Sequence, residues 1–129
     1  MIKKIGVVVG IILILAAIGF GVLMFRLAGM ANKIEGIQNK ITNVNLAKIP
    51  DGVYSGSYGD FVIFTSLEVT VKNHRITKIT IKKQDCGKGY EALATIDRII
   101  KAQSPKVDAV TGASSSSRCI MIAVDRALR

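Results

Sequence analysis

The stretch Ser66-Leu-Glu-Val-Thr-Val-Lys-Asn-His-Arg-Ile-Thr-Lys-Ile-Thr-Ile-Lys82 contains two runs in which apolar and polar residues alternate. The apolar positions are Leu67, Val69 and Val71 in the first run and Ile79 and Ile81 in the second. Successive side chains of a strand point to opposite faces, so each run predicts a strand with one buried face. Asn73 and His74 between the runs tolerate the positive φ of a two-residue turn. We therefore expect an antiparallel hairpin with His74 in its turn, in preference to a role for this residue as an acid or base.

The segments on both sides of this hairpin extend the predicted domain. Residues 51–60 alternate Gly, Ser and Asp with Val and Tyr, which indicates a short strand with tight ends. Two segments beyond the hairpin have apolar residues at helical spacing, namely 90–103 and 116–128. The apolar positions are Leu93, Ile96, Ile99 and Ile100 in the first segment and Ile120, Ala123, Val124, Ala127 and Leu128 in the second. The predicted fold class is α+β, with a small antiparallel sheet covered by two helices.

A single transmembrane helix is predicted at the N-terminus. Residues Ile5 to Phe25 include no charged or strongly polar side chain, and 21 residues at about 1.5 Å each span about 30 Å, the thickness of a hydrocarbon core. A cleaved signal peptide begins in a similar way, with basic residues before an apolar run, but its apolar region is usually only about 7–15 residues long. We therefore favour a retained anchor over residues 1–26.

The segment 27–50 joins this anchor to the predicted domain at 51–129. Its apolar residues Met30, Ile34, Ile37, Ile41 and Val44 recur every three or four positions. This spacing is typical of an amphipathic helix that continues the transmembrane helix and ends before Pro50, although a polar spacer is an equally good interpretation. Basic residues flank the apolar run on both sides, so charge alone does not orient the anchor.

Charge and composition exclude some functions. The formal net charge is +9, of which residues 51–129 carry +4, and aromatic residues make up 5% of the chain with no Trp. Nucleic-acid binding calls for a basic stripe or stacking aromatics, so we expect no nucleic-acid partner. Cys86 and Cys119 lack the spacing of a metal site, and we expect no metal. They could form a disulfide, or Cys119 could be a small buried thiol in the last helix.

Small and hydroxyl-bearing residues lead directly into the last helix, in the order Asp108-Ala-Val-Thr-Gly-Ala-Ser-Ser-Ser-Ser-Arg118. The first amide N–H groups of a helix lack partners within it, and the helix dipole makes this end attractive to anions. No acidic residue occupies the first turn. A phosphate here would accept hydrogen bonds from amides and serine hydroxyls and pair with Arg118. Serines before a helix also act as simple N-caps, so the residues alone leave both roles open.

At these residues the sequence resembles the FMN-binding domain family, which includes flavin-carrying subunits of the sodium-pumping NADH:quinone oxidoreductase and the Rnf complex. Asp108, Thr111, Gly112, Ala113 and Ser114 match the family motif Asp-x-x-(Ser/Thr)-Gly-Ala-(Thr/Ser). The resemblance extends to an Asp-Gly-x-Tyr-x-Gly opening at residues 51–56 and to Ala-Gln-Ser at 102–104.

The resemblance implies a covalent cofactor. In this family a flavin transferase uses FAD and Mg²⁺ to join FMN through its phosphate to the last motif residue, here Ser114, where Thr is more common. Asp108 would orient the segment for the transferase, and Gly112 and Ala113 would leave room for the flavin phosphate. The remaining candidate cofactor contacts are Thr111, Ser115, Ser116, Ser117 and Arg118, and the three serines are also alternative acceptors.

By the same resemblance, the expected protein is a single-pass flavoprotein of the cell membrane with an extracytoplasmic domain. It would carry electrons from a membrane reductase or a quinone-linked donor, and whether it is itself an enzyme stays open. Two other functions are compatible with the residues. They are a module that binds FMN or another phosphorylated ligand noncovalently, and a surface or complex-assembly subunit without a cofactor.

Overall fold

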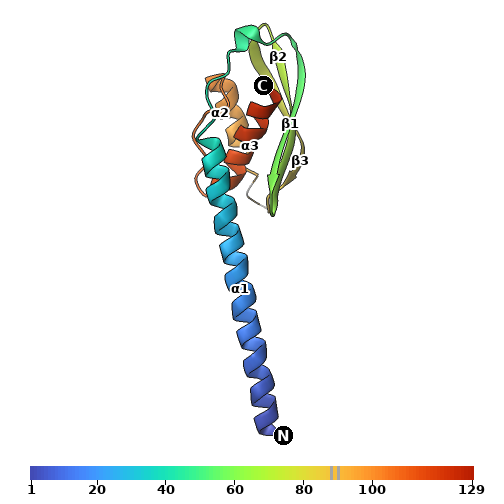
Figure 1. The fold of residues 1–129 in the computed structure, drawn as a ribbon. Coiled ribbons are helices and arrows are strands. Elements are labelled where there is room, and N and C mark those ends of the chain that lie inside the picture. Colours follow the sequence, from blue (N-terminus) through green and yellow to red (C-terminus); the bar gives the residue numbers. More distant parts are fainter. Residues whose placement is uncertain (88, 90) are drawn as a thin grey trace.

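The computed structural model describes residues 1–87, 89 and 91–129. The first helix, α1, is long, and a short 3-10 helix, three strands and two further helices follow it (Figure 1). Their bounds are α1 (Ile2–Gln38), η1 (Leu46–Lys48), β1 (Gly52–Asp60), β2 (Ile63–Lys72), β3 (Arg75–Asp85), α2 (Ala94–Ala102) and α3 (Ser114–Ala127). The predicted α+β class is confirmed.

The sheet is a meander in the order β1-β2-β3 with antiparallel neighbours. The predicted hairpin is confirmed as β2 and β3, and both Asn73 (φ 52°) and His74 (φ 59°) adopt the expected left-handed backbone in its turn. The His74 ring also fixes the turn, because its Nδ1 lies 3.2 Å from the carbonyl oxygens of Leu46 and Ile49. This contact joins the turn to the segment around η1.

One face of the sheet is buried, as the alternation predicts. Every second residue of β2 from Ile63 to Val71 is buried. In β3 the buried residues Ile76 and Ile79 are three positions apart, which a regular strand would place on opposite faces. The register shifts opposite Thr70 and Val71, and a bulge of this kind inserts one extra residue, so both isoleucines reach the same face.

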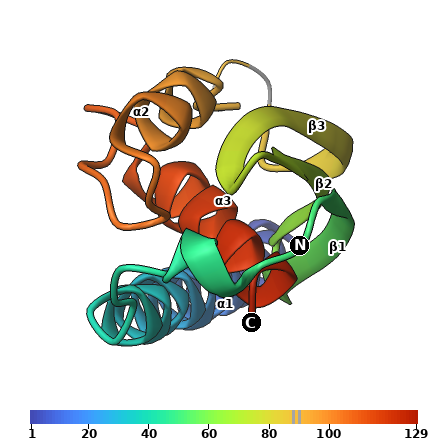
Figure 2. The same ribbon diagram turned by 90° about the horizontal axis from the view of Figure 1, so that it is seen from above.

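Helix α3 is the centre of the core. It packs on β1 and β2, and the end of α1 and the shorter helix α2 lie on its other side (Figure 2). The whole predicted apolar stripe of this helix is buried. Met121 and Ile122, outside that stripe, are buried as well, because α3 has neighbours on more than one side.

Helix α2 begins four residues later than the predicted segment 90–103. Ala92 has a left-handed backbone with φ 53°, which a helix cannot contain, and Tyr90 lies outside the described residues. The helix ends at Ala102, and Gln103 adopts the left-handed conformation of a C-cap.

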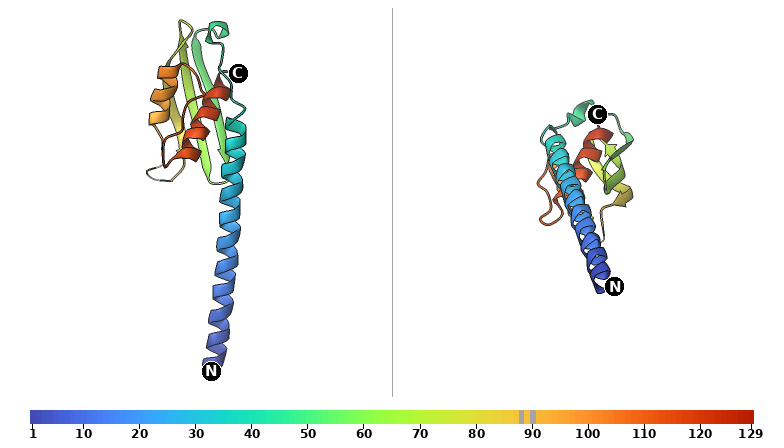
Figure 3. Two further views of the ribbon diagram at one scale, coloured as in Figure 1. Left: turned by 90° about the vertical axis from the view of Figure 1, so that its left-hand side faces the viewer. Right: turned by 60° about the horizontal axis from the view of Figure 1, so that its bottom comes forward.

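Most of α1 projects beyond the domain, and its last part lies alongside it (Figure 3). Among the described residues, α1 is the one helix long and apolar enough to cross a membrane, with a mean hydropathy of 3.0 in its apolar window. The predicted continuation of the apolar segment as a helix is correct as far as Gln38, where α1 ends. Ile34 near this end is completely buried in the core.

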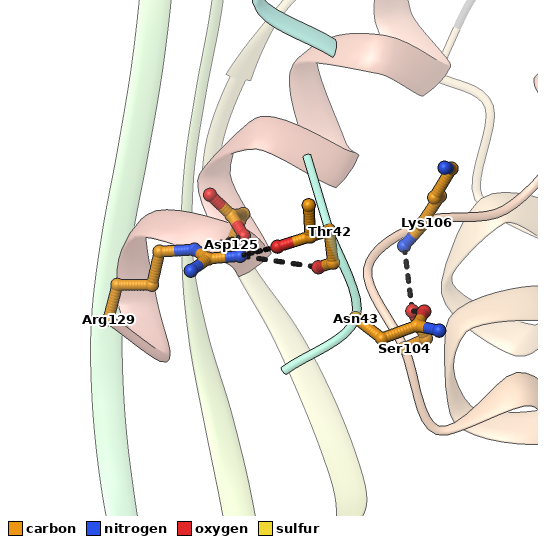
Figure 4. Close-up of polar contacts among 6 residues, drawn as sticks. All are labelled: Thr42, Asn43, Ser104, Lys106, Asp125 and Arg129. Carbon is orange, nitrogen blue, oxygen red and sulfur yellow. Dashed lines mark hydrogen bonds and ion pairs between the residues drawn. The ribbon is translucent and has the colours of Figure 1, made fainter. Parts of the chain in front are cut away.

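Hydrogen bonds hold the segment after α1 against the rest of the domain (Figure 4). Arg129 Nη2 donates to Thr42 O at 3.2 Å and to Thr42 Oγ1 at 2.9 Å. Ser104 Oγ donates to Asn43 Oδ1 at 2.7 Å. The segment between α1 and β1 is thus attached to Arg129 after α3 and to the α2–α3 loop.

Candidate functional site

The N-terminus of α3 has the features of an anion site. The helix begins at Ser114, two residues earlier than predicted, and its N-cap residue, Ala113, has no side chain that could accept a hydrogen bond from the first turn. The first turn has no acidic residue. The first amide N–H groups and the positive end of the helix dipole are therefore left for another negative group.

The four serines differ sharply in access. Ser117 is completely buried, and its Oγ accepts from Val110 N at 2.9 Å and donates to Ala113 O at 2.8 Å. Ser116 is also buried, Ser115 is half-buried and Ser114 is exposed. Ser117 therefore closes the loop onto the helix, while Ser114 is open to solvent.

The loop before the helix is fixed in place by hydrogen bonds from α2. Arg98 Nη1 donates to the carbonyl oxygens of Asp108 at 2.9 Å and Ala109 at 3.1 Å. Gly112 has φ 82°, a conformation that L side chains rarely adopt, so the chain needs glycine at this turn. Thr111 and Gly112 are exposed. The motif is thus a surface loop with a defined shape.

An open pocket of about 570 Å³ lies beside this helix end. One side consists of the last motif residues and the first turn of α3, and the other sides come from α1, the β1–β2 turn with the start of β2, and the residues after β3. The lining residues are Met30, Val62, Ile63, Cys86, Gly87, Gly112, Ala113, Ser114, Ser115 and Ser116. Hydroxyl groups thus meet apolar walls, which is the combination that small-molecule sites generally use.

Among the residues that the structure describes, Cys86 is the one titratable side chain in this lining. Burial raises its pKa, with smaller upward contributions from Glu91 and Asp85, and a hydrogen bond with Ser116 acts in the opposite direction. Both cysteines are free, and burial also raises the pKa of Cys119, whose thiol donates to Tyr58 O at 3.3 Å. At neutral pH both groups are therefore neutral thiols, and Cys119 is the small buried thiol that we weighed against a disulfide.

The structure brings some of the predicted site residues together and separates others. Gly112, Ala113 and Ser114 to Ser116 line the pocket. Asp108 and Thr111 line a different, open groove with Arg98, Lys101 and Lys106. Ser117 lines neither.

The guanidinium of Arg118 faces α1. Its Nη2 lies 3.8 Å from Glu35 Oε1, and Arg118 is absent from the pocket lining. The phosphate partner that we expected is thus engaged with another helix in this structure. Its Nε is buried without a hydrogen-bond partner among the described residues.

Met30, Val62, Ile63, Cys86 and Gly87 were not predicted as site residues. The alternation of β2 extends back to Ile63, but no local signal distinguishes a pocket wall from ordinary core. Only the packing of α1 and the β1–β2 turn around the helix end assembles these walls.

The Asp-Gly-x-Tyr-x-Gly segment lies at the other end of the sheet and has structural roles. Asp51 Oδ1 accepts from Asn73 N at 2.8 Å, and Tyr54 donates to Pro50 O at 2.6 Å. At Gly56 an added Cβ would lie 2.1 Å from Ala123 O of α3, so only glycine permits this close approach. These residues support the fold and do not contact the pocket.

The fold and site define a small α+β domain suited to a ligand with an anionic group and an apolar body. Comparison with protein families identifies it further: the model of the FMN-binding domain matches residues 63–129, and the chain belongs to this family. Comparisons with curated proteins and with solved structures give no match.

Proposed function

We propose that FMN is attached to Ser114 through a phosphoester and that the protein transfers electrons at the membrane surface. The observation that carries this proposal is the position of Ser114, which is the exposed serine at the start of α3 and lines the pocket of about 570 Å³. The family match supports FMN as the ligand.

The attachment is a phosphoryl-group transfer from FAD, catalysed by a flavin transferase with Mg²⁺. Ser114 Oγ forms a bond to the phosphorus on the FMN side of the FAD pyrophosphate. The bond from that phosphorus to the bridging oxygen breaks, AMP leaves with this oxygen, and the hydroxyl proton is released to a base. The accessible motif loop is suited to this reaction, because the active site of a second protein must reach it.

The residues around Ser114 would then hold the cofactor. The first amides of α3 bind the phosphate and stabilise its charge. The apolar walls from Met30, Val62 and Ile63 would contact the ring system and shield that side of it from water. When attached, FMN supplies one-electron and two-electron transfer, while the protein sets its position and surroundings.

The location of the domain explains why a covalent bond to FMN would be useful. We propose that α1 crosses the cell membrane once and places the domain outside the cytoplasm, where a dissociated flavin would be lost by diffusion. The electron donor would be a membrane reductase or a quinone-linked protein. The apolar segment of α1 and its exposed side chains in the structure support the membrane location.

Co-expression of the full chain with a flavin transferase tests the proposal. We expect flavin fluorescence in the protein band of a denaturing gel and an intact-mass increase equal to FMN minus water. Ser114→Ala should abolish both signals, and Ser114→Thr should keep them. Ser115→Ala is the matched control and should stay labelled, because only the neighbouring hydroxyl is removed.

Each alternative has its own result. Flavin that purifies with the native protein but dissociates from it on the denaturing gel would indicate noncovalent binding. If Ser114→Ala is still labelled and the flavin maps to another hydroxyl residue within 108–118, that residue is the acceptor in place of Ser114. Colourless protein after co-expression with an active transferase would contradict the cofactor assignment and favour an assembly subunit.

A further inference from the structure

Two two-residue turns terminate β2 at opposite ends, and their residues differ in kind. The β2–β3 turn consists of polar Asn73 and His74, whereas the β1–β2 turn consists of Phe61 and Val62. Phe61 is 46% exposed and Val62 54% exposed. Phe61 also has φ 48°, a backbone conformation that favours Gly, Asn or Asp over a bulky residue. In water, both the backbone and the exposure disfavour Phe at this position.

The position of this turn relative to α1 gives the apolar residues a partner. The ring of Phe61 lies under the guanidinium of Arg26, 4.9 Å from it. Arg26 directly follows Phe25, the last residue of the apolar run, and its guanidinium is therefore expected at the level of the lipid headgroups. Phe61 must lie at the same level.

The turn is attached to α1 and cannot move far from this level. Asp60, the last residue of β1, pairs with Lys33 of α1 at 3.2 Å. This pair neutralises the Asp60 carboxylate. Asp85 and Glu91 lie on the other side of the turn, where they line an open pocket with Val62, and Asp85 pairs with Lys83 at 3.7 Å. Arg26 faces the Phe61 ring, and its charge is suited to anionic headgroups. An apolar tip beside a basic side chain has the composition of a membrane-interface element.

We infer that the β1–β2 turn is a second membrane contact, in which Phe61 and Val62 insert into the headgroup region of the bilayer beside the point where α1 leaves it. This inference rests on the membrane anchoring of α1 in the proposed function. It deepens that function, because Val62 and Met30 line the pocket beside Ser114. Met30 is four residues beyond Arg26, about 6 Å along the helix. The cofactor pocket then lies against the bilayer surface, within reach of a membrane-embedded electron donor.

The absence of Trp from the chain allows a direct test. The full chain is reconstituted without flavin in vesicles of phosphatidylcholine and phosphatidylglycerol, with or without brominated acyl chains, and single Trp variants are compared by fluorescence. Phe61→Trp reports the turn. Asn73→Trp is the matched control, because it occupies the same turn position with φ 52° at the far end of β2. Phe20→Trp reports the anchor.

We expect the brominated lipids to remove most of the emission of Phe20→Trp, to quench Phe61→Trp partly because the headgroup region borders the brominated acyl chains, and to leave Asn73→Trp unchanged. If Phe61→Trp does not fold, Val62→Trp takes its place, with the same expectation. Quenching of Phe20→Trp without quenching at the turn would overturn the inference while the anchor stands. Absence of quenching at Phe20 as well would contradict the anchor itself. If the emission of Phe61→Trp is unchanged by the brominated lipids and changes only when a membrane protein is co-reconstituted, the turn contacts a protein partner. This result would also overturn the inference.

Discussion

At the residue scale, a close approach between the sheet and α3 depends on a missing side chain. Gly56 of β1 faces the backbone of Ala123 in α3. Ala127, one helical turn further along α3, also occupies the space that a Cβ at position 56 would need. Because backbone atoms cannot move aside as a flexible side chain can, Gly56→Ala must displace the strand from the helix. We expect it to lower the free energy of unfolding by about 1–3 kcal/mol, measured by thermal unfolding of the detergent-solubilised chain.

Gly52→Ala is the matched control for this prediction. It lies on the same strand, and an added Cβ would meet the Tyr54 ring at 3.7 Å, an ordinary van der Waals distance. Its stability should remain close to that of the parent. Equal stability of the two variants would show that β1 and α3 can separate without cost, contrary to the packing argument.

At the element scale, one side chain attaches α2 to the sheet. The Gln103 amide group accepts from Ile76 N at 2.7 Å and donates to Ile76 O at 2.9 Å and Ile100 O at 2.6 Å. Gln103→Ala would leave the amide of the buried Ile76 without a partner. We expect a loss of about 1–3 kcal/mol in unfolding free energy and faster hydrogen exchange at the Ile76 amide.

Gln103→Gly distinguishes the effect of losing these side-chain hydrogen bonds from the effect of backbone strain at position 103. Glycine suits the left-handed conformation at position 103 (φ 53°) but cannot form the bridge. It should therefore remain destabilised, with the same fast exchange at Ile76. Recovery of parental stability in this variant would assign the effect to backbone strain. Lys101→Ala, on the exposed surface of α2, should be neutral.

At the scale of the whole molecule, the core includes residues from before the predicted domain start at 51. Ile34 of α1 and Ile41 and Ile49 of the following segment are buried together with residues of the sheet and α3. A chain beginning at residue 27 keeps these side chains, whereas one beginning at residue 51 loses all three. We expect the shorter piece to be less stable by about 4.5–9 kcal/mol, from about 1.5–3 kcal/mol for each buried isoleucine. Urea unfolding of the two pieces measures this difference.

A point substitution provides the check on this truncation. Ile34→Ala in the piece 27–129 should cost about 2–5 kcal/mol, because it leaves a cavity beside α3. Equal stability of 51–129 and 27–129 would instead show that the C-terminal residues form a self-sufficient core and that the end of α1 only rests on it.

The elements that the sequence predicted correctly depend on local periodicity. The alternation in residues 66–82 determines the hairpin, the spacing of three and four determines α3, and the uninterrupted apolar run determines the long N-terminal helix. The motif residues Asp108 to Ser114 indicated the family, which the family match confirms. The start of α2 could not be predicted, because Ala92 has no residue-type signal for its left-handed backbone.

The sequence by itself therefore determined the fold class, the apolar helix and the place of the motif before α3. Only the tertiary structure decided which serine is accessible, since Ser117 is buried by hydrogen bonds to its own loop whereas Ser114 is not. It also decided that Arg118 faces Glu35 and that Met30, Val62 and Cys86 form the pocket walls. Helix and strand patterns repeat within a few residues and can be recognised in the sequence, but these contacts join segments that only folding brings together.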